Sequence, residues 1–215
     1  MLSPHNLNFL INDSTLIEEH IAGIPGDVFI EKYLAKCTPA QQAQIAKEYV
    51  KFNERCMIRL LGDMRAYNYV VIPIHDFDQV VYKIRAIDFD QQSFEGKLMV
   101  YRPQFFKENF PMISVVKEKL SESSITQYKV EERSILAKRI QNSGTRLDKL
   151  LKIMITDEVS IPENVKKLSK EIYKFTKDDA FKRSNSMGGI MQASFAYVLR
   201  NYESLNMTNL INSRP

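Results

Sequence analysis

The sequence predicts an α+β protein, with one β-hairpin at the N-terminus, a second near the middle and a mainly helical C-terminal half. Three observations predict this class. Residues 6–21 hold two apolar runs around a turn signal, residues 69–87 hold two β-branched runs around a polar loop, and helical patterns recur beyond residue 110. With 215 residues, 44% of them hydrophobic and 26% charged, the chain is long enough for one large domain or two small ones.

The N-terminal segment is expected to form the first hairpin. Residues 6–11 and 16–21 are rich in apolar side chains, and Asn12–Asp13 between them is a turn signal. Residues 22–27 contain two glycines and a proline, which interrupt the pattern and predict a linker or hinge. Residues 28–36 then predict a short helix.

A long helix is predicted from residue 39 to about residue 60. Thr38 is a good N-cap, and Pro39 suits the first helical position. Gly62 is expected to end the helix. Apolar residues recur three or four positions apart and predict one buried face, formed by Ile45, Tyr49, Phe52, Cys56 and Leu60.

The second hairpin is expected to have strands at residues 69–74 and 80–87, joined by the polar residues 75–79. Residues 88–110 are expected to be irregular, and their aromatic side chains predict either a core or the wall of an acceptor pocket. These aromatic residues are Phe94, Tyr101, Phe105, Phe106 and Phe110.

Beyond residue 110 the patterns predict five helices. Ser160 and Glu163 have the spacing of a capping box before the fourth helix. The lysines of the third and fourth helices are best interpreted as a solvated face. The expected helices cover residues 111–120, 130–141, 145–154, 162–175 and 186–202.

Composition excludes several classes of function. The net charge of +4 permits an anionic ligand but requires neither nucleic acid nor membrane, so we expect neither as a partner. The two cysteines, Cys37 and Cys56, have no metal-ligand spacing. No apolar run approaches the ~20 residues of a membrane helix, and the N-terminus has no signal-peptide pattern. A cytoplasmic location is therefore expected.

Asp63, Asn68 and Asp88 are the candidate site. Asp63 and Asn68 follow the long helix, and Asp88 follows the second strand of the central hairpin, which can return it to Asn68. In phosphoryl transfer, one Asp can orient a substrate hydroxyl, while an Asn and a second Asp hold a metal against nucleotide phosphates. Mg²⁺ prefers such oxygen ligands.

Each of these residues alone has a simpler explanation. An Asp–Asn pair in a loop is often a turn, and an Asp after a strand is often a helix cap. The joint order of long helix, Asp-x4-Asn, hairpin and Asp favours the functional interpretation. His75 at the hairpin tip is better explained as part of a solvated turn. Residues 184–189 suit either an anion-binding helix start or an ordinary N-cap.

The segments Gly62-Asp63-x4-Asn68 and Ile87-Asp88-Phe89-Asp90 resemble the protein-kinase-like fold, in the aminoglycoside phosphotransferase and choline kinase branch. The resemblance implies a large lobe that uses ATP and Mg²⁺. It makes Asp63 the catalytic base and Asn68 and Asp88 the metal ligands. Residues 16–23 resemble the end of the small lobe and the hinge. Backbone groups of Glu19, His20 and Ile21 would then bind adenine.

Two departures from the family pattern limit the resemblance. Leu61 stands where the family has a histidine, and about fifteen residues precede the hinge, too few for the glycine-rich loop and its lysine. The resemblance thus divides the chain into a small-lobe remnant and hinge, residues 1–27, and a kinase-like large lobe, residues 28–215. It implies a fragment of a longer protein, one half of a split kinase completed by a second polypeptide, or a reduced member with another role.

The function expected from these residues is ATP- and Mg²⁺-dependent phosphoryl transfer to a hydroxyl of a small molecule, with Asp63, Asn68 and Asp88 as the site. The alternative is a non-catalytic kinase-like module that binds a protein partner or a nucleotide. A third interpretation is a helical interaction domain in which the Asp-x4-Asn spacing is accidental.

Overall fold

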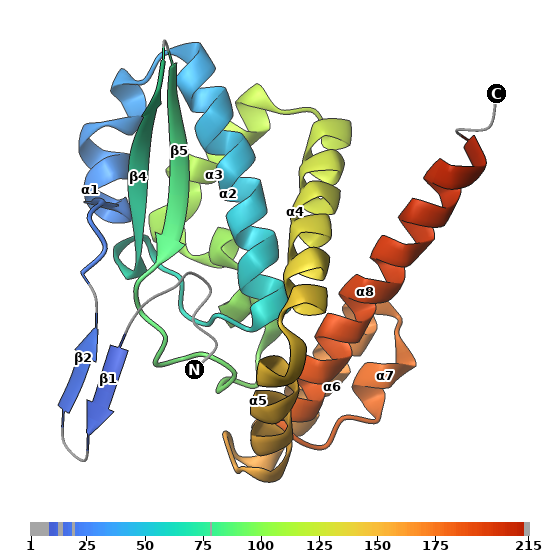
Figure 1. Ribbon diagram of the computed structural model, residues 1–215. Helices are drawn as coiled ribbons and strands as arrows, with labels where there is room; N and C mark the ends of the chain where they lie inside the picture. The colour runs from blue at the N-terminus through green and yellow to red at the C-terminus, as the bar shows by residue number, and fades with distance from the viewer. Residues whose placement is uncertain (1–8, 13–14, 19, 78, 213–215) are drawn as a thin grey trace.

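The computed structural model describes residues 9–12, 15–18, 20–77 and 79–212. The long helix α2 runs through the centre, with the β4–β5 hairpin on one side and the later helices on the other (Figure 1). The strands are β1 (Phe9–Asn12), β2 (Thr15–Glu18), β3 (Ile24–Pro25), β4 (Tyr69–Asp76) and β5 (Gln79–Ala86). The α-helices are α1 (Gly26–Lys32), α2 (Pro39–Arg59), α3 (Phe110–Lys119), α4 (Glu122–Asn142), α5 (Gly144–Thr156), α6 (Pro162–Thr176), α7 (Asp179–Lys182) and α8 (Met187–Asn212). Short 3-10 turns are η1 (Leu34–Lys36), η2 (Ala66–Asn68), η3 (Leu98–Tyr101), η4 (Pro103–Phe105) and η5 (Lys107–Asn109).

The start of α2 and its end near residue 60 are confirmed, but the prediction that Gly62 terminates it is wrong. The Thr38 hydroxyl accepts a hydrogen bond from Gln41 N, and the Gln41 side chain accepts one from Thr38 N, which completes a capping box. At the other end Leu60, not Gly62, takes the left-handed conformation, with φ of 50°. Leu60 is fully buried, so tertiary packing holds a conformation that glycine adopts more easily.

Both predicted hairpins are present. β1 pairs antiparallel with β2, and a second sheet has the order β3-β4-β5. The central hairpin is tighter than expected, because Asp76 pairs with Gln79 and the predicted loop residues 75 and 76 belong to β4. β3 lies in the predicted linker, where Ile24 pairs with Val71 of β4. The predicted helix over residues 28–36 is divided into α1 and η1.

The buried residues form two clusters that meet at α2. The first joins α1, most of α2, the β3-β4-β5 sheet and α3, and includes Phe29, Ile45, Tyr49, Phe52, Cys56, Val71, Ile84 and Met112. The second joins the end of α2 to α4–α8, and includes Ile58, Leu60, Leu136, Leu168, Phe181, Ile190 and Val198. One helix therefore packs against the sheet and against the helical half, and its C-terminal end lies where the two clusters meet.

All five predicted C-terminal helices are confirmed, with α4 and α8 longer than expected and α7 unpredicted. The predicted capping box before α6 is wrong. Ile161 is the N-cap of α6, while the Ser160 hydroxyl donates to Phe94 O at 2.5 Å. Ser160 is buried beside the loop that contains Phe94, and this long-range acceptor replaces the local one.

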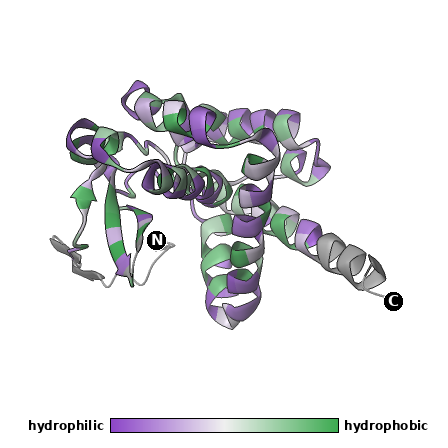
Figure 2. Cartoon of the chain, turned by 90° about the horizontal axis from the view of Figure 1, so that it is seen from above, coloured by the Kyte–Doolittle hydropathy of each residue, from purple (hydrophilic) through white to green (hydrophobic). Residues whose placement is uncertain are grey.

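Hydrophobic and hydrophilic residues are mixed along the helices when the molecule is seen from above (Figure 2). Among the described residues, none of the helices combines the length and the apolar character that crossing a bilayer requires.

Candidate functional site

Asp63 lies in the loop between α2 and β4 in a conformation that side chains seldom adopt. Its φ is 51°, in the left-handed region. Its backbone N–H donates to Val100 O at 3.1 Å, which ties this loop to η3. About a third of the side chain is exposed. Sparsely populated backbone conformations cluster at functional sites, where surrounding contacts hold them in place.

Asn68 is buried and fixes the same loop. Its Nδ2 donates to Asp63 O at 2.8 Å, and its backbone N–H donates to Arg65 O at 2.9 Å. Because Nδ2 is the donor, Oδ1 is the free acceptor of the amide, and no hydrogen bond among the described residues uses it. Asn68 can therefore offer a neutral oxygen to a cation while it positions Asp63.

The segment that contains Asp88 packs against the loop that contains Asp63. Ile87 N donates to Asn68 O at 3.1 Å, and Ser93 N donates to Leu60 O at 2.9 Å. A Cβ added at Gly62 would lie 2.5 Å from Gln91 O, so the two backbones approach too closely for a side chain at Gly62. The central hairpin thus brings all three predicted residues onto two adjoining segments.

Negative charge gathers on these segments. Burial raises the pKa of Asp88, and the nearby carboxylates of Asp90 and Asp63 raise it further, although a backbone hydrogen bond from Asp90 opposes them. A cation between these oxygens would relieve the repulsion. Asn68 and Asp88 therefore suit Mg²⁺, which keeps several waters and needs few protein ligands. In the described part of the chain, no three His, Cys, Asp or Glu side chains form a complete metal-binding cluster.

Arg65 is a member of the site that the sequence analysis missed. Its Nε donates to Asp63 Oδ1 at 2.9 Å, and its Nη1 donates to Glu108 Oε1 at 3.0 Å. The hydrogen bond to Asp63 raises the pKa of Arg65. Its position two residues after Asp63 was the available signal, but that spacing alone does not predict the partner Glu108.

Asn109 holds the loop of the site in place and was also missed by the sequence analysis. It is completely buried, and its Nδ2 donates to Met64 O and to Pro103 O, both at 2.9 Å. Its Oδ1 accepts from the Tyr69 hydroxyl at 2.9 Å. One amide therefore joins the Asp63 loop, η4 and the start of β4. The partners lie up to 45 residues away in the chain, so no local pattern indicates them.

Two of the three predicted adenine-binding residues, His20 and Ile21, lie shortly before β3. Glu19 is outside the described residues. His20 is exposed and Ile21 is half-buried, in the segment between β2 and β3. Close by, a Cβ added at Gly23 would lie 2.9 Å from Val70, so this segment runs tightly along β4.

A cavity of about 290 Å³ opens beside the Asp88 segment. Asp90 and Gln92 supply polar groups, and Leu150 of α5 supplies apolar surface. Ser93 also lines it, has φ of 57°, and carries a buried hydroxyl without a hydrogen-bond partner among the described residues. Of the predicted aromatic cluster, Phe94 lines this cavity and Tyr101 belongs to the second core, so the cluster does not act as one unit.

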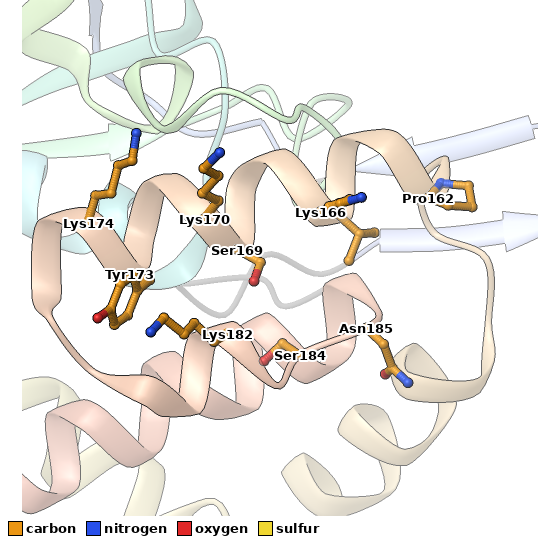
Figure 3. Close-up of a pocket in the computed structure, with 10 residues that line it drawn as sticks. Pro162, Lys166, Ser169, Lys170, Tyr173, Lys174, Lys182, Ser184 and Asn185 are labelled. Carbon is orange, nitrogen blue, oxygen red and sulfur yellow. The ribbon is translucent and has the colours of Figure 1, made fainter.

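A larger cavity, of about 540 Å³, lies between α6 and α7. None of its lining residues belongs to the segments around Asp63 and Asp88. Figure 3 shows Lys170 and Lys174 extending from the side of α6 away from α7, whereas Ser169 and Tyr173 lie toward Lys182. The lysines do not converge on one point, as expected for a solvated face.

The helix start after residue 184 is an ordinary cap. The Ser186 hydroxyl accepts a hydrogen bond from Gly189 N at 3.1 Å. The Gly189 N–H is therefore already occupied and is not available to an anion. This favours the N-cap over the anion-binding interpretation.

Comparisons of the chain with protein-family models, with curated proteins and with solved structures found no match.

Proposed function

We propose that this protein is a kinase-like phosphotransferase that moves a phosphoryl group from ATP, with Mg²⁺, to a hydroxyl of a small molecule. The observation that carries the proposal is the Asn68 side chain. Its Nδ2 holds the backbone of Asp63, while its backbone oxygen accepts from Ile87 N, next to Asp88. Its side-chain Oδ1 accepts no hydrogen bond among the described residues and is therefore available to a cation.

The side chains have distinct roles in this reaction. The Asp63 carboxylate accepts the proton of the acceptor hydroxyl, or orients that hydroxyl for attack. Asn68 Oδ1 and the Asp88 carboxylate hold Mg²⁺, which supplies positive charge against the phosphate oxygens when it is bound. Arg65 lies within hydrogen-bond distance of Asp63 and can turn toward a phosphate once substrate competes for that carboxylate.

The acceptor is proposed to bind in the cavity lined by Asp90, Gln92, Ser93 and Phe94. Its volume of about 290 Å³ suits a small molecule and not a folded domain. Asp90 and the unpartnered Ser93 hydroxyl can hydrogen-bond a polyol or an amine, and Phe94 can pack on its apolar face.

Thermal unfolding with ATP plus Mg²⁺ tests the metal and nucleotide site. We expect a dose-dependent rise in the melting temperature of the wild type, absent in Asp88→Asn and Asn68→Ala. Asp157→Asn makes the same charge change at an exposed residue outside the site and should respond like the wild type. Equal responses from all four proteins would overturn the site.

Phosphoryl transfer to a panel of hydroxyl acceptors tests catalysis. Asp63→Asn keeps the shape of the side chain but removes the base, so we expect transfer to fall by about 10²-fold or more while nucleotide binding persists. Full transfer by Asp63→Asn would exclude Asp63 as the base.

The second candidate is a non-catalytic module that binds nucleotide. It is favoured by the Arg65–Asp63 hydrogen bond, which occupies the proposed base. Arg65→Met separates the two candidates. In a kinase, freeing Asp63 changes the rate of transfer in either direction, whereas in a module no transfer appears although ATP plus Mg²⁺ still stabilises the chain.

A further inference from the structure

A small cavity lies on the far side of α2 from the sheet, between the end of α2, α4, the start of α5 and α8. Its volume is about 110 Å³. Two guanidinium side chains line it, Arg59 from α2 and Arg139 from α4, together with the Ser143 hydroxyl. Its remaining surface is apolar, including Ile58, Leu136 and Phe195.

The positive charge in this cavity is not balanced. Arg59 Nη1 is buried and has no hydrogen-bond partner among the described residues. Burial, together with repulsion from Arg139 and Arg55, lowers the pKa of Arg59 to about 10, although the charge of Glu132 opposes this shift. In the described part of the chain neither Arg59 nor Arg139 has a carboxylate within 4.0 Å.

The neighbouring arginines show how unusual this arrangement is. Arg55, one turn earlier on α2, is paired with Glu48 at 2.6 Å and with Glu132 at 3.1 Å. Arg133, nearly two turns before Arg139 on α4, is paired with Glu54 at 2.5 Å. Glu132 is already bound to Arg55 and is not free to neutralise Arg59. Arg59 as a whole is half-buried, but its Nη1 is enclosed and lacks the acceptor that a buried donor normally has.

The lining also restricts the ligand. The Ser143 hydroxyl donates its proton to Ile140 O at 2.5 Å, so it cannot donate to an anion. The two guanidinium groups are the side-chain donors that remain, and the other lining residues are apolar. A compact dianion such as phosphate would place oxygens against Ile58 and Phe195 without donors. A carboxylate with a short apolar tail matches both parts of the lining.

We propose that this cavity is a binding site for a short-chain carboxylate, whose oxygens bridge Arg59 and Arg139 and whose tail packs on Leu136 and Phe195. The site is separate from the proposed phosphotransferase site and does not depend on it. A hydrogen bond links the cavity to the proposed phosphotransferase site. In it, Gln92 Nε2 of the Asp88 segment donates to Arg59 O at 3.3 Å. Binding of the carboxylate stabilises the end of α2 and, through it, the Leu60–Asp63 loop.

The test is thermal unfolding of the full chain with sodium butyrate, propionate or phosphate, against sodium chloride at equal ionic strength. The wild type should show a saturable rise in melting temperature with butyrate. Arg139→Gln removes one charged donor at an exposed position and should weaken binding about tenfold or more. Arg146→Gln is the matched control, since Arg146 is exposed on α5 and does not line the cavity.

Arg59→Met gives a second, independent result. It removes a half-buried guanidinium whose enclosed Nη1 has no partner among the described residues, so the variant without ligand should melt no lower than the wild type, while its response to butyrate is lost. In addition, the Nε–H NMR signals of Arg59 and Arg139 should shift together on titration with butyrate. No saturable effect of butyrate beyond chloride, or equal weakening by Arg139→Gln and Arg146→Gln, would overturn the site. Tighter binding of phosphate than of butyrate would overturn the assignment to a carboxylate.

Discussion

Two groups of charged residues, one around Arg55 and one around Asp63 and Asp88, are built in opposite ways. At Arg55, one buried cation is held by Glu48 and Glu132, and Ile84 of β5 completes the network through its backbone N–H and O. Around Asp63 and Asp88, the carboxylates of Asp63, Asp88 and Asp90 lie near one another, and Arg65 is the cation that contacts Asp63. The first group satisfies its members internally, whereas the second keeps an excess of negative charge.

The pKa shifts follow this difference. Burial by itself lowers the pKa of Arg55, but Glu48 and Glu132 outweigh burial and raise it above its usual value. Burial raises the pKa of Asp88, and its neighbours Asp90 and Asp63 add to that rise. A satisfied network stabilises the fold, while an unbalanced one costs stability until a ligand arrives. The contrast is the physical reason to look for a site at Asp88 and not at Arg55.

The largest effect is expected from Arg55→Met. It leaves Glu132 buried without a cation and Glu48 with only Lys83, at 4.0 Å, so we expect a loss of about 3–5 kcal/mol in the free energy of unfolding. Urea denaturation measures this loss. Adding Glu48→Gln and Glu132→Gln to the same chain should recover part of the stability. No recovery would show that Arg55 acts through packing and not through charge.

The next largest effect is expected from Asn109→Ala. It leaves Met64 O, Pro103 O and the Tyr69 hydroxyl buried without their partner, which predicts a loss of about 2–3 kcal/mol. Tyr69→Phe removes one of the three hydrogen bonds and should cost about 1 kcal/mol. Equal losses in the two variants, measured in urea, would contradict the role of Asn109 as the link between three segments.

Gly62→Ala should cost about 1–3 kcal/mol, because the new Cβ would lie 2.5 Å from Gln91 O and must displace the Asp88 segment. The matched control is Gly189→Ala. Gly189 lies in α8, where alanine is favourable, and the atom nearest to the new Cβ would be Ser186 Oγ at 3.4 Å. We expect the first variant to lose stabilisation by ATP plus Mg²⁺ and the second to keep it. The same melting temperature for both would show that the two loops can separate freely.

The smallest effect is expected from Asp88→Asn without ligand. Because the folded-state pKa of Asp88 is raised, its contribution to stability is present at low pH and is lost as the pH rises through that pKa. The variant should therefore gain on the wild type as the pH rises from the ordinary aspartate pKa through the raised pKa of Asp88, where the wild-type side chain becomes charged. Urea midpoints across this range measure the gain. A gap that grows in favour of the wild type would mean that Asp88 has a cation already built into the fold.

Local patterns predicted the elements well. Thr38 and Pro39 fixed the start of α2, because a cap needs only residues within one turn. The β-branched runs predicted β4 and β5, and the spacing of Asp63, Asn68 and Asp88 was enough to expect them together once a hairpin joined them. These features depend on neighbours in the sequence.

The failures share one cause, which is competition from residues far away in the chain. Ser160 has a capping-box spacing, but its hydroxyl donates a hydrogen bond to Phe94 O instead. Gly62 looks like a helix stop, but burial of Leu60 ends α2 earlier, and Gly62 serves the approach of Gln91 instead. Arg65 and Asn109 gained their roles from Glu108 and Met64.

The sequence by itself determined the helices, the hairpins and the three polar residues, because capping, alternation and spacing act over a few residues. The tertiary structure alone decided which charges are balanced. Arg55 and Arg59 are one turn apart on the same helix, yet Glu132 of α4 reaches the first and leaves the second facing Arg139. Which carboxylate meets which guanidinium depends on how distant helices pack, and no local pattern contains that information.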